Sequence, residues 1–167
     1  MNVAILGGSF DPPHNGHLFV AKQMLRNKNC DKIILTPVFK HPFGKPLTDP
    51  KHRLAMARLL KEKNIEISDI EIKRKEISYS IDTLNALKKL FPKDDFVWII
   101  GKDQIRDFEK WKDWREIKKK FGLIIIPRTP IDISSSEVRE RIRKGKSIKN
   151  IVPGKVESYI IEHKLYL

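Results

Sequence analysis

Short apolar runs alternate along this chain with longer segments in which apolar positions recur every three or four residues. The short runs predict β-strands, and the longer segments predict amphipathic helices. Predicted strands cover residues 3–6, 32–37, 65–67, 70–72, 96–100 and 123–127, and the pair at 65–67 and 70–72 is the weakest. Predicted helices cover residues 16–27, 50–63, 81–90 and 111–120.

Strands that are apolar throughout are typical of a parallel sheet covered by helices on both faces. The pattern therefore predicts an α/β fold with a Rossmann-like, doubly wound parallel sheet. Right-handed crossovers place the carboxyl ends of all strands along one edge of such a sheet. Ligands bind at this edge, near the point where the strand order reverses.

Two further helices are predicted after the last strand. Ser134 and Glu137 have the spacing of a capping box, in which the serine accepts a backbone N–H and the glutamate reaches back to the cap. This helix carries Arg139 and should end near Gly145, and a second helix should run from about residue 153 to about 165. We expect a small C-terminal helical extension. Because we find no repeat, low-complexity tract or linker, residues 1–167 should form a single domain.

Composition limits the classes of partner. Lys and Arg number 34 against 21 Asp and Glu, a net charge of +13, which can serve nucleic acid, an anionic membrane or small anionic substrates. The lysines are interspersed with glutamates, as on a solvated surface, and no segment is long and apolar enough to span a bilayer. The single cysteine, Cys30, excludes an internal disulfide and fits a reducing compartment. We therefore expect a cytoplasmic protein without a membrane or nucleic-acid partner.

Residues 7–17, with the sequence GGSFDPPHNGH, connect the first predicted strand to the first predicted helix. Glycines at the end of a strand let the backbone approach a ligand closely. His14 and His17 are three residues apart at a helix start, where free N–H groups and the positive end of the dipole attract anions. A zinc site would need a further Cys or His nearby, and the segment has none. The pattern favours a phosphate-binding site.

The segment Gly8-Ser9-Phe10-Asp11-Pro12-x-His14-x-Gly16-His17 closely resembles the signature of the adenylyltransferase branch of the nucleotidyltransferase superfamily. Other segments are similar to those of the bacterial nicotinate-nucleotide adenylyltransferase family. They are residues 78–84 (SYSIDTL), 99–103 (IIGKD), 111–114 (WKDW), 133–139 (ISSSEVR) and the C-terminal run 151–166. The resemblance extends in the same order from residue 3 to 166, which makes it far more specific than a single motif.

The resemblance implies adenylyl transfer from ATP to nicotinate mononucleotide, giving nicotinate adenine dinucleotide and pyrophosphate, a late step of NAD biosynthesis. This transferase chemistry requires no enzyme nucleophile, because the mononucleotide phosphate is already ionised. The protein must align two anions and neutralise charge that builds on the phosphates. Mg²⁺ is expected as a cofactor held mainly by substrate phosphates and water, without a metal site made of protein side chains.

The resemblance also assigns site residues by position. The catalytic residues are expected to be His14, His17, Lys45 and Arg139. The expected ATP-binding residues are Gly8, Ser9, Phe10, His14, His17, Asp103, Ser134, Ser135 and Arg139. The residues expected to bind the mononucleotide are Ser78, Tyr79, Ser80, Thr83 and Trp111.

Several of these residues have plainer interpretations. Asp103 either receives a ribose hydroxyl, as the resemblance implies, or caps the next helix, and both roles can coexist. Trp111 either stacks on the pyridine ring or forms one apolar helix face with Trp114. The hydroxyl residues from Ser78 to Thr83 either line the nicotinate side or belong to an ordinary capped helix start.

The chain departs from the family in two loops. Family members carry a Pro-Pro-His-Lys/Arg element where this chain has residues 40–46, KHPFGKP. Lys45 is the expected basic residue near the phosphates, and Lys40 or His41 could take its place. Arg53, in the helix that follows, is a further phosphate neighbour or a surface charge. The connection 128–132 is short, so part of the adenine-side wall or a homo-oligomer contact could differ.

Three other functions remain as alternatives. Phosphopantetheine adenylyltransferases share the Gly-Ser-Phe-Asp-Pro element but usually have threonine where His14 stands, and they lack the 78–84 and 111–114 segments. Nicotinamide mononucleotide would differ from the favoured acid only by the groups that pair with an amide or a carboxylate. A basic nucleic-acid-binding module would explain the charge but not residues 7–17.

Overall fold

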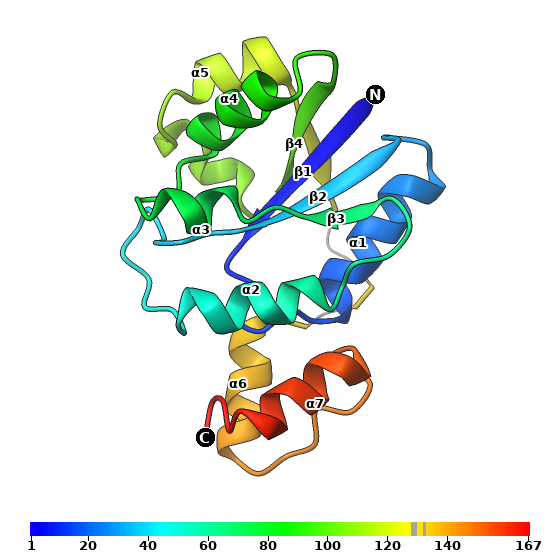
Figure 1. The fold of residues 1–167 in the computed structure, drawn as a ribbon, viewed down its shortest axis with the longest axis vertical. Helices are drawn as coiled ribbons and strands as arrows, with labels where there is room; N and C mark the ends of the chain where they lie inside the picture. The colour runs from blue at the N-terminus through cyan, green and yellow to red at the C-terminus, as the bar shows by residue number, and fades with distance from the viewer. Residues whose placement is uncertain (128–129, 132) are drawn as a thin grey trace.

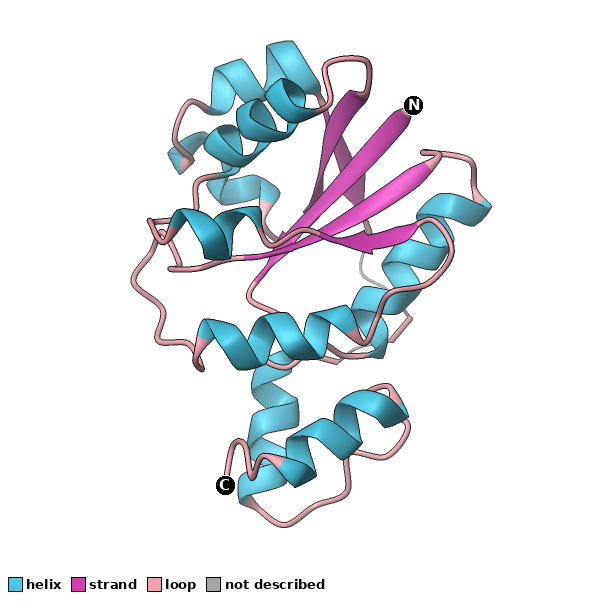
Figure 2. Ribbon diagram, in the orientation of Figure 1, coloured by secondary structure: helices cyan, strands magenta, loops and turns pink. Residues whose placement is uncertain are grey.

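A five-stranded, all-parallel sheet in the order β3-β2-β1-β4-β5 forms the centre of the molecule. The computed structural model describes residues 1–127, 130, 131 and 133–167. Figure 1 shows the strands side by side, and Figure 2 shows helices on both sides of them. The strands are β1 (Asn2–Gly8), β2 (Lys32–Pro37), β3 (Ile65–Ile67), β4 (Asp95–Gly101) and β5 (Leu123–Ile126). The predicted Rossmann-like α/β fold is confirmed.

The helices follow the predicted order, with two additional ones at residues 70–74 and 105–110 and with the predicted helix 111–120 beginning only at residue 114. They are α1 (Asn15–Arg26), α2 (Pro50–Arg58), α3 (Ile70–Arg74), α4 (Ser80–Leu90), η1 (Ile105–Lys110), α5 (Trp114–Glu116), η2 (Ile117–Phe121), α6 (Ser135–Arg143) and α7 (Gly154–Glu162). The strand predicted at 70–72 is wrong, because these residues form the short helix α3. Their apolar-polar-apolar order resembles a strand, but Ile70 packs down onto the sheet after the turn at Ser68. The helix η1 was not predicted.

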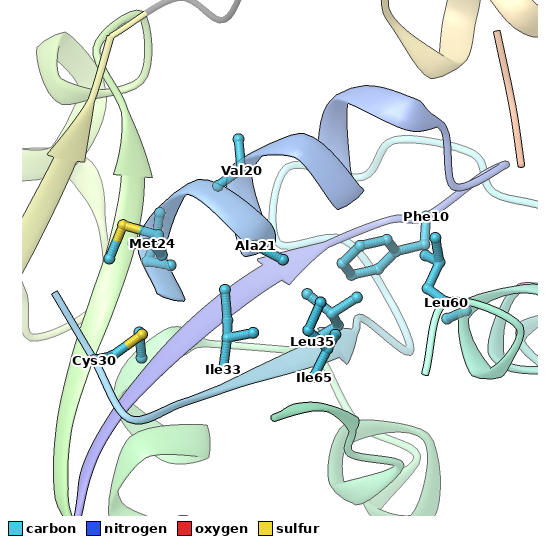
Figure 3. Packing of buried hydrophobic residues seen from close by; sticks show 12 residues of the cluster. Phe10, Val20, Ala21, Met24, Cys30, Ile33, Leu35, Leu60 and Ile65 are labelled. Atoms are coloured by element: carbon cyan, nitrogen blue, oxygen red, sulfur yellow. The ribbon is translucent and has the colours of Figure 1, made fainter. Parts of the chain in front are cut away.

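The two faces of the sheet are covered by different helices. On one face, α1 and α2 pack against β1, β2 and β3, and Figure 3 shows Val20, Ala21 and Met24 of α1 above Ile33 and Leu35 of β2. On the other face, α4, η1 and η2 pack against β1, β2 and β4. The core is therefore doubly wound, as the apolar strands predicted.

The C-terminal helices form a third cluster. Val138 of α6 and Val156 and Ile160 of α7 pack together and against Met56 of α2. Figure 1 shows α6 and α7 together at the end of the molecule opposite α4 and α5. The predicted C-terminal helical extension is confirmed, although α7 ends at Glu162, earlier than expected.

The strand order places the reversal point between β1 and β4. From β1 the chain proceeds outward to β2 and β3, then crosses back to β4 on the other side of β1. The carboxyl ends of β1 and β4 are Gly8 and Gly101, so the crevice for a ligand should open at these two glycines. Among the described residues, no helix has the length and apolarity needed to cross a membrane.

Candidate active site

His14 and His17 lie together at the start of α1. Their ring centroids are 3.9 Å apart, as the i, i+3 spacing predicted. The backbone N–H of Gly16 donates to His14 Nδ1 at 3.1 Å, and the backbone N–H of His14 donates to His17 Nδ1 at 3.1 Å. Each neutral ring must therefore carry its proton on Nε2. The pair presents two N–H donors, which suit phosphate oxygens.

Both imidazoles are held neutral. Burial lowers the pKa of His14 to about 4. The pKa of His17 is lowered well below its usual value by burial and, secondarily, by its neighbour His14. Gly16 makes the arrangement sterically feasible, because a Cβ there would lie 2.9 Å from the His14 ring. The donors at this helix start therefore act through neutral N–H groups and the helix dipole.

This neutrality predicts a pH effect on stability. The unfolded chain takes up a proton at His14 below about pH 6.5, whereas the folded protein resists protonation until about pH 4. The unfolded state then binds more protons, so the free energy of unfolding should fall between pH 6.5 and 4, by up to about 3 kcal/mol for His14. The free energy of unfolding, measured by urea denaturation at several pH values in this range, should fall less steeply with decreasing pH in His14→Gln than in the wild type. The exposed control His163→Gln should show the wild-type dependence on pH. Equal slopes in all three proteins would contradict the assignment.

The N-terminus of α6 packs against the turn that precedes the histidines. The Ser135 hydroxyl donates to the Pro12 carbonyl at 2.8 Å, and Arg139 Nη1 donates to the Asp11 carbonyl at 2.6 Å. Ser134 caps α6 by accepting the Glu137 N–H at 3.1 Å. The structure thus brings the predicted Ser134, Ser135 and Arg139 group beside the histidine turn.

The glutamate half of the predicted capping box differs. The Glu137 carboxylate lies 3.9 Å from Arg141, one turn along α6, where an exposed pair of opposite charges at i, i+4 is favourable. The helix end agrees with the prediction, since α6 ends at Arg143 and Gly145 follows with a positive φ of 63°.

Asp11 ties the same turn to the C-terminus, a contact that sequence reasoning missed. Its buried carboxylate accepts the Tyr166 hydroxyl at 2.7 Å and the Thr48 N–H at 3.0 Å. Burial and the hydrogen bond to Asp11 raise the pKa of Tyr166, so the phenol stays protonated as the donor. The only signal available was the family-like C-terminal run, which suggested no partner.

A cavity of about 610 Å³ opens where β1 and β4 end. Most of the predicted mononucleotide residues, part of the predicted ATP set and the predicted catalytic residue Lys45 line it together. They are Gly8, Ser9, Lys45, Ser78, Tyr79, Ser80, Asp103 and Trp111. The histidine pair, Phe10 and the α6 group lie outside this lining. The Phe10 ring is buried in the core and lies 4.7 Å from the His17 ring, centroid to centroid.

Thr83 lies behind the cavity wall. It is fully buried, and its hydroxyl donates to Glu71 Oε1 at 2.7 Å. Thr83 is therefore not placed to contact a substrate directly, contrary to expectation, and instead holds the Glu71 carboxylate. Glu71, which the erroneous strand prediction concealed, is itself buried and lines the cavity. Burial raises the pKa of Glu71, and the hydroxyls of Ser78 and Thr83 oppose that rise.

The loop after β2 brings two of its three basic candidates to the cavity. Lys45 and His41 both line it, whereas Lys40 pairs its backbone with Ile77. Burial lowers the pKa of His41, and the nearby Lys45 lowers it further. Lys45 and His41 are therefore neighbours at the cavity.

The two tryptophans separate in the structure. Trp111 lines the cavity and packs edge-on against Phe108 and Trp98, with ring centroids 5.5 and 6.3 Å away. Trp114 packs against Phe108 at 6.0 Å and is covered on its other side by the Arg115 guanidinium at 4.8 Å. They do not share one helix, because Asp113 takes a left-handed conformation and α5 starts only at Trp114. Of these two, Trp111 lines the cavity and Trp114 does not.

Comparisons with known proteins agree along almost the whole chain. The model of the cytidylyltransferase-like family matches residues 5–141. Probable nicotinate-nucleotide adenylyltransferases of Methylacidiphilum infernorum and Dictyoglomus thermophilum are 36% and 35% identical, covering 99% and 100% of this chain and 92% and 100% of their own lengths. A solved Plasmodium falciparum nicotinic acid mononucleotide adenylyltransferase, complexed with NaAD, is similar with a TM-score of 0.81 and 27% identity over 99% of this chain and 97% of that one.

Proposed function

We propose how the site performs adenylyl transfer, given that the chain belongs to the nicotinate-nucleotide adenylyltransferases of the cytidylyltransferase-like family. The chain catalyses attack by a phosphate oxygen of nicotinate mononucleotide on the α-phosphorus of ATP. The new P–O bond forms as the bond to the β-phosphate oxygen breaks, and pyrophosphate leaves with that electron pair. The products are nicotinate adenine dinucleotide and pyrophosphate.

The observation that carries this proposal is the pair of Nε2–H donors at the start of α1. Negative charge shifts toward the departing pyrophosphate in the transition state, and fixed N–H donors stabilise it without having to reorganise. Because His14 Nδ1 and His17 Nδ1 are both occupied by backbone N–H groups, the tautomers are set before ATP binds. In this account neither histidine transfers a proton.

The second half of the phosphate site comes from α6. We place the β- and γ-phosphates near Arg139, whose planar fork suits phosphate oxygens, and near the helix start at Ser134 and Ser135. The backbone of residues 8–10 and the side chain of Lys45 complete the ATP side. Asp103, at the end of β4, is assigned to a ribose hydroxyl.

Mg²⁺ is proposed to enter with ATP. Imidazole and guanidinium groups dominate the phosphate side, and these groups bind phosphate oxygens, whereas Mg²⁺ prefers carboxylates, phosphates and water. Within the described residues, no three His, Cys, Asp or Glu side chains are grouped so as to hold a metal ion. Such an ion neutralises charge on the phosphates as they react.

The acceptor occupies the cavity in this proposal. Ser78, Tyr79 and Ser80 line the side assigned to the nicotinate ring, and Trp111 supplies a face for stacking. The substrates are strongly anionic, so attraction of these substrates explains part of the net charge of +13 and no nucleic-acid partner is needed for it. Residues 1–167 are proposed to work as one unit in a reducing cytoplasm, where the buried Cys30 stays a thiol.

Trp111→Ala should raise the KM for nicotinate mononucleotide roughly tenfold and leave the KM for ATP within about twofold, because base-aromatic stacking is worth roughly 1–3 kcal/mol. Steady-state kinetics with each substrate varied in turn measures this split. Trp114→Ala is the matched control, since that ring packs outside the cavity. If both variants lose stability alike and neither changes the acceptor KM selectively, Trp111 is a core residue only.

The proposed reaction is tested by following both products. Purified protein with ATP, Mg²⁺ and nicotinate mononucleotide should yield dinucleotide and pyrophosphate in equal amounts. Omitting the mononucleotide should abolish pyrophosphate release. Pyrophosphate formed without the acceptor, or no turnover at all, would overturn the proposal.

A further inference from the structure

Arg53 is the largest fully buried side chain of the described residues, with 0% of its surface exposed. The sequence suggested a phosphate neighbour or a surface charge, and its burial agrees with neither. Its guanidinium donates to four backbone carbonyls. Nε reaches Thr48 at 2.8 Å, Nη1 reaches Ser9 at 2.9 Å and Val38 at 2.7 Å, and Nη2 reaches Phe39 at 3.1 Å.

Burying the Arg53 cation costs free energy, so we expect its hydrogen bonds to hold particular backbone segments in place. Burial lowers the pKa of Arg53, and the charges of Asp11, Asp49 and Glu71 counter this from a distance. No carboxylate of the described residues forms a salt bridge with Arg53. Carbonyl dipoles therefore solvate the cation, and their number and directions suit only a planar fork with several donors.

The four carbonyls belong to two segments that meet at the reaction centre. Ser9 lies in the turn after β1, which leads to the histidine pair. Val38 and Phe39 open the loop after β2, and Thr48 closes it, so one side chain holds both ends of the loop that carries His41 and Lys45. The Val38 N–H also donates to the Gly8 carbonyl at 3.0 Å, which reinforces the same junction.

The network continues to the acceptor side of the cavity. The Phe39 carbonyl is held by Arg53, while the Phe39 N–H donates to the Ser78 hydroxyl at 2.9 Å. The Ser78 N–H in turn donates to the Lys40 carbonyl at 3.0 Å. Arg53 is therefore two hydrogen bonds away from the wall proposed to receive the pyridine ring.

We propose that Arg53 is a positioning residue that sets the distance between the ATP phosphates and the mononucleotide phosphate. This inference rests on the proposed function. Loss of Arg53 should disturb the alignment of the two substrates more than the binding of either one. The residues assigned to ATP and those assigned to the mononucleotide each remain in place to bind their own substrate. The effect should therefore appear in kcat, since correct alignment is a large part of catalysis when the nucleophile is already ionised.

Three variants test this. Arg53→Lys keeps the charge but cannot reach four carbonyls, Arg53→Met keeps the length without donors, and Arg53→Ala leaves space for an added guanidinium ion. Arg58→Met is the matched control, because Arg58 lies on the same helix but is exposed and pairs with Asp69 at 3.1 Å. Thermal unfolding of each variant shows whether it folds.

We expect Arg53→Lys to lower kcat at least about tenfold while calorimetric Kd values for ATP and for the mononucleotide, measured separately, stay within about threefold. Millimolar methylguanidinium should restore part of the kcat of Arg53→Ala and leave Arg58→Met and His17→Asn unchanged.

Two results would overturn the inference. One is an Arg53→Lys variant with wild-type kcat. The other is a parallel loss of stability, binding of both substrates and activity in the Lys and Met variants, with no rescue of the Ala variant, which would make Arg53 a stabilising residue only. An inactive wild type would instead overturn the proposed function and the inference with it, so the two failures are distinguishable.

Discussion

His17→Ala should lower kcat about 100-fold or more, because the variant loses a donor that is already aligned with the departing phosphate. Removal of one preorganised donor of this kind costs roughly 100- to 1,000-fold in kcat in other enzymes. His14→Ala should also lower kcat, by a smaller factor.

Two further variants separate the two nitrogens of His17. Gln places an N–H near the position of Nε2 and should retain more activity than Asn, which reaches only the position of Nδ1. Steady-state and single-turnover kinetics on folded protein give the comparison. A His17→Ala enzyme with near-normal kcat would contradict the assignment, as would an Asn variant more active than the Gln variant.

Arg139→Met should lower kcat/KM for ATP about 100-fold, the second largest effect expected. A planar guanidinium beside the helix start of α6 can donate to two phosphate oxygens at once, and charge-assisted bonds of this kind are strong. Arg139→Lys should recover only part of the loss, because an ammonium lacks the fork.

The control for Arg139 lies on the same helix. Arg143→Met changes an exposed residue of the last turn of α6 and should leave kcat/KM unchanged. Because Arg139 Nη1 also holds the Asp11 carbonyl, urea denaturation must accompany the kinetics. Equal kcat/KM values for Arg139→Met and wild type, or a loss of stability with no kinetic change, would contradict a role at the phosphates.

The fold was predictable where local pattern determines structure. The strand β2 has its predicted bounds, because a continuous apolar run bounded by polar residues is typical of a strand that is covered on both faces. The short α3 was not predictable, since five residues are too few to reveal a helical period. The segment 111–120 failed for a related reason, because the left-handed Asp113 delays the helix and the last turn widens into η2.

In the candidate site too, residues in local motifs were predictable and residues that act through distant partners were not. The histidine pair and the Ser134 helix start are local motifs, and the structure brings both to the turn at Asp11 and Pro12. Arg53 and Tyr166 act through partners 5 to 155 residues away, and a single sequence gives no sign of such pairings. Their importance lies in tertiary contacts that only the folded chain displays.

Acceptor choice tests directly whether nicotinate mononucleotide is the substrate that receives the adenylyl group. We would measure kcat/KM for pyrophosphate release with nicotinate mononucleotide, nicotinamide mononucleotide and phosphopantetheine at fixed, saturating ATP and Mg²⁺. We expect the highest value for nicotinate mononucleotide, a lower one for the amide and none measurable for phosphopantetheine. A preference for the amide or for phosphopantetheine, or no acceptor-dependent release at all, would contradict it.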